Sequence, residues 1–199
     1  MNVLLIGDSH MGRGLGQVLN NLSTSISTFT VLIPRTIDLI TLEYRSKLQE
    51  IYLFNPDVIV VHLGHNDMVR HPIHNLNPSV STTVASSTIT FADEIHYNFP
   101  TATIFISAIF PRTHTDSSML SSPEIISYNK IAKRHGQRIR TFAKIAGYKY
   151  FINNSMWHKI SNSIEDPSIF LLDGLHLNPT GQLTILFEWL ESIARSDSA

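Results

Sequence analysis

The sequence contains no cysteine. This absence excludes a disulfide framework, a thiolate metal site and a cysteine nucleophile. The N-terminal residues also lack the basic region and long apolar run of a signal peptide, and no apolar stretch approaches the length that crosses a bilayer. Because a chain without cysteine fits a reducing compartment, we expect a cytoplasmic, intracellular protein.

Charged residues are scarce as well. They make up 16% of the 199 residues and leave a formal net charge of −1 at pH 7, so bulk charge does not indicate a polyanion-binding protein. Hydrophobic residues make up 43%, which is typical of a globular protein. The length suffices for one α/β domain with a sizeable core, and we expect residues 1–199 to form a single domain.

Short apolar runs alternate with longer helix-like segments. The runs predict strands at residues 2–7, 28–33, 57–63, 103–110 and 148–152. Helices are expected at residues 12–22, 38–54, 80–98 and 123–147 and after Pro179, with Asp38, Ser122 and Asn178 as N-caps and a loop at residues 65–79. This order predicts a parallel sheet with helices on both faces, in which ligands bind beyond the carboxyl ends of the strands.

Two short motifs far apart in the sequence carry the residue types of an acyl-transfer site. Gly7-Asp8-Ser9-His10 ends the first predicted strand, and Asp173-Gly174-Leu175-His176 precedes the last helix. A serine nucleophile needs a histidine to take its proton and a carboxylate to orient that histidine. Ser9, His176 and Asp173 could supply these groups. Taken alone, Ser9 is more simply an N-cap, Asp173 a cap and His176 a surface histidine.

A third motif falls on the same predicted edge of the sheet. Gly64-His65-Asn66-Asp67 follows the third strand. The Asn66 side chain and the Ser9 amide could donate hydrogen bonds to the oxyanion of an acyl-transfer intermediate. The alternative for Asn66 is an Asx-turn, and we expect Asp67 to anchor the loop.

In order and approximate spacing, these three motifs resemble those of the SGNH, or GDSL-type, hydrolases, over nearly the whole chain. The resemblance implies a flavodoxin-like three-layer α/β/α sandwich with a five-stranded parallel sheet. It implies Ser9 as the nucleophile, His176 as the base, Asp173 as its orienting acid, and Ser9 and Asn66 as oxyanion donors. It also implies hydrolysis of small acyl esters, lipids or acetylated sugars without a metal or cofactor. We therefore expect a serine esterase that favours short acyl groups such as acetyl.

One departure from the family concerns the oxyanion hole. The family usually has a glycine after the second strand, whose amide is a further donor. Here residues 34–38 fill that place, and no glycine occurs between Gly16 and Gly64. The amide of Arg35 or of Thr36 could serve instead, and the sequence does not choose between them.

A narrower resemblance concerns the residues around two of the motifs. Residues 6–10 and 62–67 are similar to those of the esterase domain in the first-open-reading-frame protein of some LINE (non-LTR) retrotransposons. That domain is similar to platelet-activating-factor acetylhydrolases and is associated with acetylester hydrolysis and lipid binding. The resemblance implies a lipid ester as one candidate substrate.

The ten histidines raise the question of a metal site. His62, His65, His71 and His74 have tempting spacings, but they span a strand end and a loop and few carboxylates accompany them. We therefore favour core, loop or surface roles and expect no metal. His10 could line the pocket or face water at the start of a helix.

A cluster of basic residues suggests a second class of function. Residues 130–149 hold seven of the fifteen lysines and arginines and no acid. A basic helix face could contact anionic lipid or RNA, although a solvated face is the simpler interpretation. The alternative function is an SGNH-fold module for lipid or RNA binding or self-association, with slow or vestigial esterase activity. The residues of this candidate contact are Lys130, Lys133, Arg134, Arg138 and Arg140.

Overall fold

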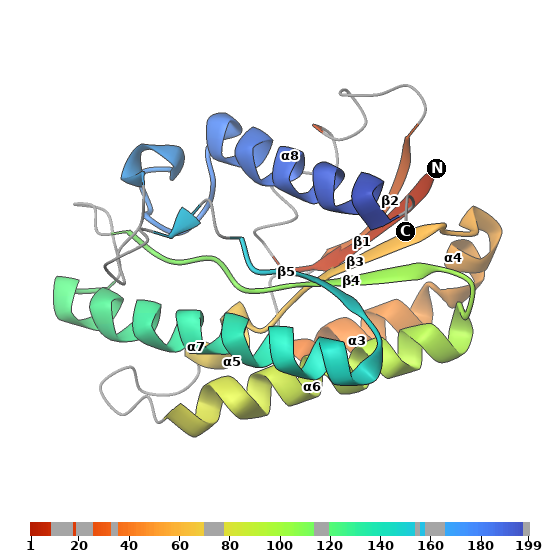
Figure 1. The fold of residues 1–199 in the computed structure, drawn as a ribbon, viewed down its shortest axis with the longest axis horizontal. Helices are drawn as coiled ribbons and strands as arrows, with labels where there is room; N and C mark the ends of the chain where they lie inside the picture. Colours follow the sequence, from red (N-terminus) through yellow and green to blue (C-terminus); the bar gives the residue numbers. More distant parts are fainter. Residues whose placement is uncertain are drawn as a thin grey trace.

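The computed structural model describes residues 1–8, 18, 26–32, 36–69, 78–113, 120–153, 156–157 and 166–196. These residues contain one five-stranded sheet with the strand order β2-β1-β3-β4-β5, in which every pair is parallel (Figure 1). The strands are β1 (Asn2–Gly7), β2 (Ser27–Leu32), β3 (Val58–His62), β4 (Thr103–Ser107) and β5 (Lys149–Phe151). The predicted parallel α/β sheet is confirmed.

Helices cover both faces of the sheet, as Figure 1 shows. One face carries α3 (Ile37–Ser46), α4 (Leu48–Phe54), α5 (His65–Val69), α6 (Pro78–Asn98) and α7 (Ser122–Ala146). The other carries α8 (Pro179–Ser196), preceded by the short 3₁₀ helix η3 (Pro167–Ile169). The predicted helix at residues 12–22 lies outside the described residues apart from Val18, which is helical.

The two faces of the sheet form two separate cores. Because successive side chains of a strand point to opposite faces, Leu4 and Ile6 pack with α3, α6 and α7, whereas Val3 and Leu5 pack with α8. Strands buried on both faces read as continuous apolar runs, which is why the strands stand out in the sequence. Trp189 on α8 is almost fully buried in the second core.

The second predicted helix differs from the structure at its start and in its middle. It consists of α3 and α4, separated at Lys47, and Thr36 rather than Asp38 occupies the N-cap position. The carboxylate of Asp67 accepts the Ile37 amide at 3.2 and 3.3 Å, so a residue thirty positions away caps this helix. Asp38 lies in the first turn, where its negative charge favours the helix dipole.

Three further boundaries were predicted wrongly. The predicted loop at residues 65–79 contains α5. The predicted strand at 103–110 ends at Ser107, and the carbonyl of the next residue, Ala108, accepts a hydrogen bond from the Asn153 side chain. Ser121, not Ser122, caps α7 in a capping box with Glu124. For α8 the predicted cap is confirmed, because Asn178 Oδ1 accepts the Gly181 amide at 3.0 Å.

Candidate active site

The carboxyl ends of three strands lie side by side in the sheet register. Gly7 at the end of β1 pairs with His62 of β3, which pairs with Ser107 of β4. The chain segments that leave these strands therefore begin at one edge of the sheet, hereafter the carboxyl rim. Asp8, which follows β1, is almost fully buried there. Ser9 and His10 lie outside the described residues.

Asp173 and His176 are joined by a short polar contact. Asp173 Oδ2 lies 2.6 Å from His176 Nδ1. The other carboxylate oxygen, Oδ1, accepts the backbone amides of Leu175 and His176, both at 2.9 Å. The Asp173 side chain is 36% exposed and that of His176 only 8%. The carboxylate is thus fixed by its own loop and holds the imidazole at Nδ1.

The loop that carries this pair is fixed at both ends. The Leu171 amide donates to the His176 carbonyl at 2.7 Å, and Phe170 pairs with Leu177 in an antiparallel bridge. Gly174 has φ +66°, a left-handed conformation that glycine adopts at little cost. A three-residue spacing therefore suffices to bring the two side chains together.

Hydrogen bonds control the charge state of Asp173. Burial by itself raises the pKa of this carboxyl, but hydrogen bonds from the backbone and ring of His176 and from the Leu175 amide outweigh it. The net pKa is lowered. Asp173 is thus a carboxylate at neutral pH, the form that can orient an imidazole and stabilise its protonated state.

Asn66 lies in the first turn of α5, just beyond β3, and is partly buried. The turn that starts this helix needs a glycine at position 64. Gly64 has φ +108°, and a Cβ there would lie 2.4 Å from Val84 Cγ1. Asp67, next to Asn66, lies in α5 rather than in a loop, and its carboxylate accepts the Ile37 amide as described, so it caps α3.

The segment in which the SGNH resemblance leads us to look for a third oxyanion donor, residues 34–38, is described only from Thr36 onward. Thr36 is buried, and its carbonyl accepts the Ile40 amide at 3.0 Å. The Ile37 amide is bonded to Asp67. Arg35, one of the two candidate donors, lies outside the described residues. The third oxyanion donor therefore stays a choice between Arg35 and Thr36.

A polar cluster at the carboxyl rim, formed by His65, Arg112 and Tyr128, was missed by sequence reasoning. The Arg112 guanidinium hydrogen-bonds to His65 Nε2, and the Tyr128 hydroxyl lies 2.7 Å from His65 Nδ1. The Tyr128 ring also lies under the guanidinium, 4.9 Å from Cζ to the centroid. The three residues come from three elements far apart in sequence.

This cluster lies close enough to His176 to interact with it electrostatically. Burial lowers the pKa of His65 well below its usual value, with smaller contributions from the charges of Arg112, His62 and His176. The Thr113 amide donates to the Gly174 carbonyl at 2.9 Å, which ties the segment after β4 to the loop of Asp173 and His176. The fold thus brings His176 and the helix of Asn66 to the same end of the sheet.

His62 is a core histidine. Its Nδ1 lies 3.0 Å from Ser107 Oγ, which also accepts the Asn153 side-chain amide. The side-chain oxygen of Asn153, Oδ1, in turn accepts a hydrogen bond from the Trp189 indole N–H at 3.0 Å. Burial, followed by the charge of His135, lowers the pKa of His62 to about 3. Among the described residues no group of three or more histidine, aspartate and glutamate side chains could hold a metal ion, and His71 and His74 lie outside them.

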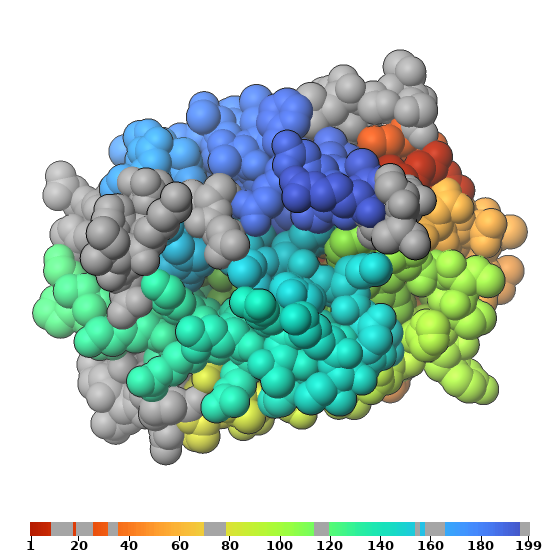
Figure 2. Space-filling model, in the orientation of Figure 1, coloured from red at the N-terminus to blue at the C-terminus, as the bar shows by residue number. Residues whose placement is uncertain are grey.

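The predicted basic residues lie on α7, whose surface is visible in Figure 2. Lys130, Arg134, Arg138 and Arg140 are exposed, whereas Lys133 is partly buried with its ammonium 5.9 Å from the Trp157 ring centroid. A surface pocket of about 380 Å³ lies between Arg134 and Arg138 on α7 and Ser81 on α6. Across the described ranges, none of the helices has the length and apolar character to traverse a membrane.

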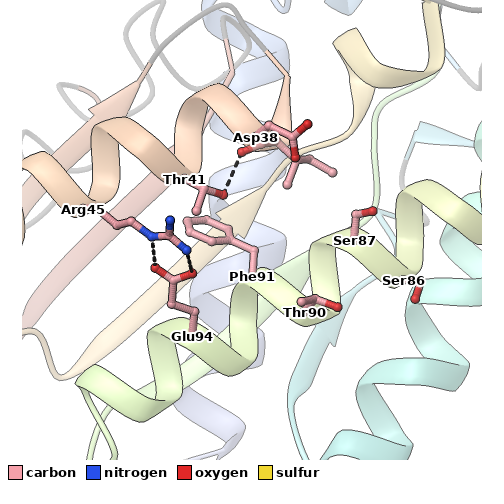
Figure 3. A pocket seen from close by; sticks show the side chains of 9 residues that line it. Asp38, Thr41, Arg45, Ser86, Ser87, Thr90, Phe91 and Glu94 are labelled. Atoms are coloured by element: carbon pink, nitrogen blue, oxygen red, sulfur yellow. Dashed lines mark hydrogen bonds and ion pairs between the residues drawn. The ribbon is translucent and has the colours of Figure 1, made fainter.

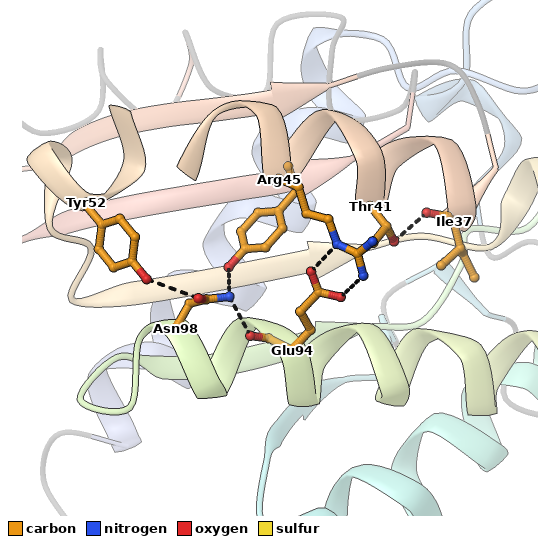
Figure 4. A network of polar contacts seen from close by, with 7 residues as sticks. Ile37, Thr41, Arg45, Tyr52, Glu94 and Asn98 are labelled. Carbon is orange, nitrogen blue, oxygen red and sulfur yellow. Dashed lines mark hydrogen bonds and ion pairs between the residues drawn. The ribbon is translucent and has the colours of Figure 1, made fainter. Parts of the chain in front are cut away.

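A second pocket, of about 270 Å³, lies between α3 and α6 (Figure 3). Two of its three charged residues, Arg45 and Glu94, are paired by two hydrogen bonds of 2.7 Å, and the third is Asp38. Asn98 continues this polar network, bridging Tyr52 and Tyr44 (Figure 4). These contacts join α3 and α4 to α6.

Comparison with known proteins relates the chain to hydrolases by fold. No protein-family model matches the sequence, and no curated protein sequence matches it. A structure from Bacteroides fragilis assigned as an acylhydrolase has a TM-score of 0.71 at 14% identity, covering 98% of this chain and 87% of that one. A structure from Parabacteroides merdae assigned as a GDSL-like lipase has a TM-score of 0.67 at 14% identity, covering 96% and 94%.

An acetylxylan esterase of Geobacillus stearothermophilus is also similar. Its TM-score is 0.66 at 13% identity, with 96% of this chain and 93% of that chain covered. At such low identity the likeness is one of fold. The flavodoxin-like arrangement expected from the motifs is confirmed, and the chain has the α/β/α fold that these hydrolases share.

Proposed function

We propose that the protein is a serine esterase that hydrolyses short-acyl esters, acetyl esters first among them. Ser9 would attack the ester carbonyl, His176 would take its proton, and Asp173 would orient the imidazole. The Ser9 amide and the Asn66 side chain would donate to the oxyanion. The protonated His176 would then give its proton to the leaving alcohol as the acyl-enzyme forms. Water, deprotonated by His176, would finally attack the acyl-enzyme and release the acid and free Ser9.

The observation that carries this proposal is the contact between Asp173 and His176. A carboxylate with a lowered pKa holds Nδ1 at 2.6 Å, so the proton sits on Nδ1 and Nε2 is the nitrogen that would act as the base. Such an arrangement is required of the base in a hydroxyl-based acyl transfer. Ser9 directly follows Asp8, which is placed at the carboxyl rim.

The fold of the similar proteins supports the reaction class. They carry names of acylhydrolase, lipase and acetylxylan esterase, all of which act on esters. Three finer points stay part of the proposal. They are the preference for acetyl esters, a lipid as the substrate, and the narrower resemblance to the LINE-protein esterase domain. Hydrolysis of a series of p-nitrophenyl esters from acetyl to palmitoyl would measure the preferred acyl length.

The direct test is hydrolysis of p-nitrophenyl acetate by the wild type and by Ser9→Ala. We expect the substitution to lower kcat by about 10⁴-fold or more, as for other serine nucleophiles. The control is Ser86→Ala, an exposed serine on α6, which should leave kcat unchanged. Equal rates for the wild type and Ser9→Ala would refute the esterase proposal.

A second candidate function is an SGNH-fold module that binds anionic lipid or RNA, or self-associates, while its ester hydrolysis is slow or vestigial. It is favoured by the exposed cations of α7 and the pocket between Arg134, Arg138 and Ser81. Both ligands present phosphates, and each phosphate contact makes binding weaker as salt concentration rises. Binding of anionic vesicles and of single-stranded RNA should be compared for the wild type and for a triple glutamine variant of Arg134, Arg138 and Arg140. Unchanged binding would exclude α7 as the contact.

A further inference from the structure

Arg112 is held in one orientation by neutral groups. A guanidinium carries only donors, so in its contact with His65 the Nε2 of the imidazole must be the acceptor. We therefore assign the His65 proton to Nδ1, which donates to the Tyr128 oxygen at 2.7 Å. The Tyr128 hydroxyl can then donate onward to the Phe110 carbonyl at 3.4 Å. None of the groups in this series of hydrogen bonds carries a negative charge.

Arg112 forms no ion pair within the described residues, although the buried Asp8 carboxylate interacts electrostatically with Tyr128, whose ring lies under the guanidinium. Its side-chain partners there are a neutral imidazole and the face of the Tyr128 ring, and no carboxylate pairs with it. Its Nε is buried and has no partner in the same residues. Arg112 is partly buried, so its charge is only partly hydrated, and an anionic partner would stabilise it.

The backbone of Arg112 is fixed as firmly as its side chain. The Arg112 amide donates to Asn129 Oδ1 and its carbonyl accepts from Asn129 Nδ2, each at 2.8 Å. The next residue, Thr113, donates to Gly174 in the loop of Asp173 and His176. On its other side, Arg112 contacts His65, the neighbour of Asn66 in α5. The segment of Arg112 thus connects α5, which carries Asn66, to the loop of Asp173 and His176.

We propose, on the basis of the esterase function above, that Arg112 binds an anionic group of the substrate, a carboxylate or a phosphate, next to the scissile ester. A guanidinium fixed at both ends pairs with such oxyanions with little loss of side-chain entropy. His65 and Tyr128 act as positioning residues that keep Arg112 in place. The preferred substrates are then esters with a negative charge on the acyl or on the alcohol side.

Two matched pairs of esters test the proposal and locate the charge. On the acyl side, p-nitrophenyl hydrogen succinate is compared with its neutral methyl ester. On the alcohol side, 4-acetoxybenzoate is compared with methyl 4-acetoxybenzoate. The measured quantity is kcat/KM for the wild type, Arg112→Gln and Arg112→Lys, with a substitution of Arg195, an exposed arginine on α8, as a control (Arg195→Gln).

We expect Arg112→Gln to lower kcat/KM about 10- to 100-fold for the anionic member of one pair, mainly through KM, as loss of a charge-assisted hydrogen bond would. The neutral member should change less than about threefold by the same principle. Arg112→Lys should restore part of the difference, and Arg195→Gln should leave it unchanged. An equal loss for anionic and neutral esters would overturn the proposal, because oxyanion stabilisation or a structural role predicts that result. No change for either pair would overturn it as well.

A binding measurement separates this proposal from the esterase function. We expect titration calorimetry to show that the wild type binds succinate or phenyl phosphate. Arg112→Gln should bind the same anion at least tenfold more weakly. If no ester is hydrolysed but this difference is found, the esterase proposal fails and the anion site stands. Equal binding by both proteins, or none by the wild type, would refute the anion site.

Discussion

The two halves of the candidate active site are assembled over very different sequence distances. Asp173 and His176 are three residues apart and are held by hydrogen bonds within one loop. The other half joins His65 on α5, Arg112 after β4 and Tyr128 on α7, residues up to 63 positions apart. The first half can be read from a motif, whereas the second exists only because the sheet brings the three segments together.

The largest expected effect falls on the local half. Asp173→Asn should lower kcat for p-nitrophenyl acetate by about 10⁴-fold, because an amide there stabilises neither the right tautomer nor the imidazolium. Asp166→Asn is the matched control, since the Asp166 carboxylate also accepts a nearby backbone amide, at 2.9 Å, but caps η3. A loss of less than tenfold in Asp173→Asn would contradict the assigned role.

Substitution of Asn66 tests the part of the candidate site that the sheet brings together. Asn66→Ala should lower kcat about 10²- to 10³-fold, the usual cost of one oxyanion donor, with little change in KM. Asn98→Ala removes an asparagine that bridges Tyr44 and Tyr52 far from the candidate site, so it should lower the melting temperature and leave kcat unchanged. If Asn66→Ala kept the wild-type kcat, the oxyanion assignment would be wrong.

Glycine substitutions measure how strictly the turn into α5 is determined. Gly64→Ala combines a positive φ with a Cβ 2.4 Å from Val84 Cγ1, so it should destabilise the fold by more than about 2 kcal/mol. Gly147→Ala also has a positive φ but meets no atom within 4 Å, and should cost about 1 kcal/mol. Urea denaturation compares the two variants. A similar loss for both would mean that packing at Gly64 is unimportant.

The buried histidines should make the protein sensitive to acid. Burial lowers the pKa of His62 and of His135 to about 3, whereas in the unfolded chain a histidine titrates near about 6.5. The unfolded state therefore binds more protons between these values. The free energy of unfolding is at its full value above about pH 6.5 and falls as the pH drops toward 3, by up to roughly 1.4 kcal/mol per pH unit for each histidine.

His135 offers a way to isolate one of these contributions. Neither of its ring nitrogens has a hydrogen-bond partner in the described part of the chain, so an apolar replacement leaves no partner unsatisfied. His135→Leu should reduce the pH slope of unfolding by the share of one histidine, measured by urea denaturation from pH 7 to pH 5. An unchanged slope would show that His135 does not stay neutral in the fold.

The sequence predicts elements that are buried on both sides better than it predicts their ends. The strands were recognised because their residues are apolar on both faces. The start of α3 was misplaced because its cap, Asp67, is supplied from another segment. The helix α5 was missed because a five-residue segment is too short to show helical periodicity.

The sequence alone was enough to predict a parallel α/β sheet and the pairing of Asp173 with His176. Each depends on periodicity or on a short loop, which local residue order determines. Only the tertiary structure placed Arg112 between His65 and the Asp173–His176 loop, made His65 neutral by burial, and capped α3 with Asp67. These features depend on which segments become neighbours in the sheet, and on water being excluded between them, neither of which local sequence encodes.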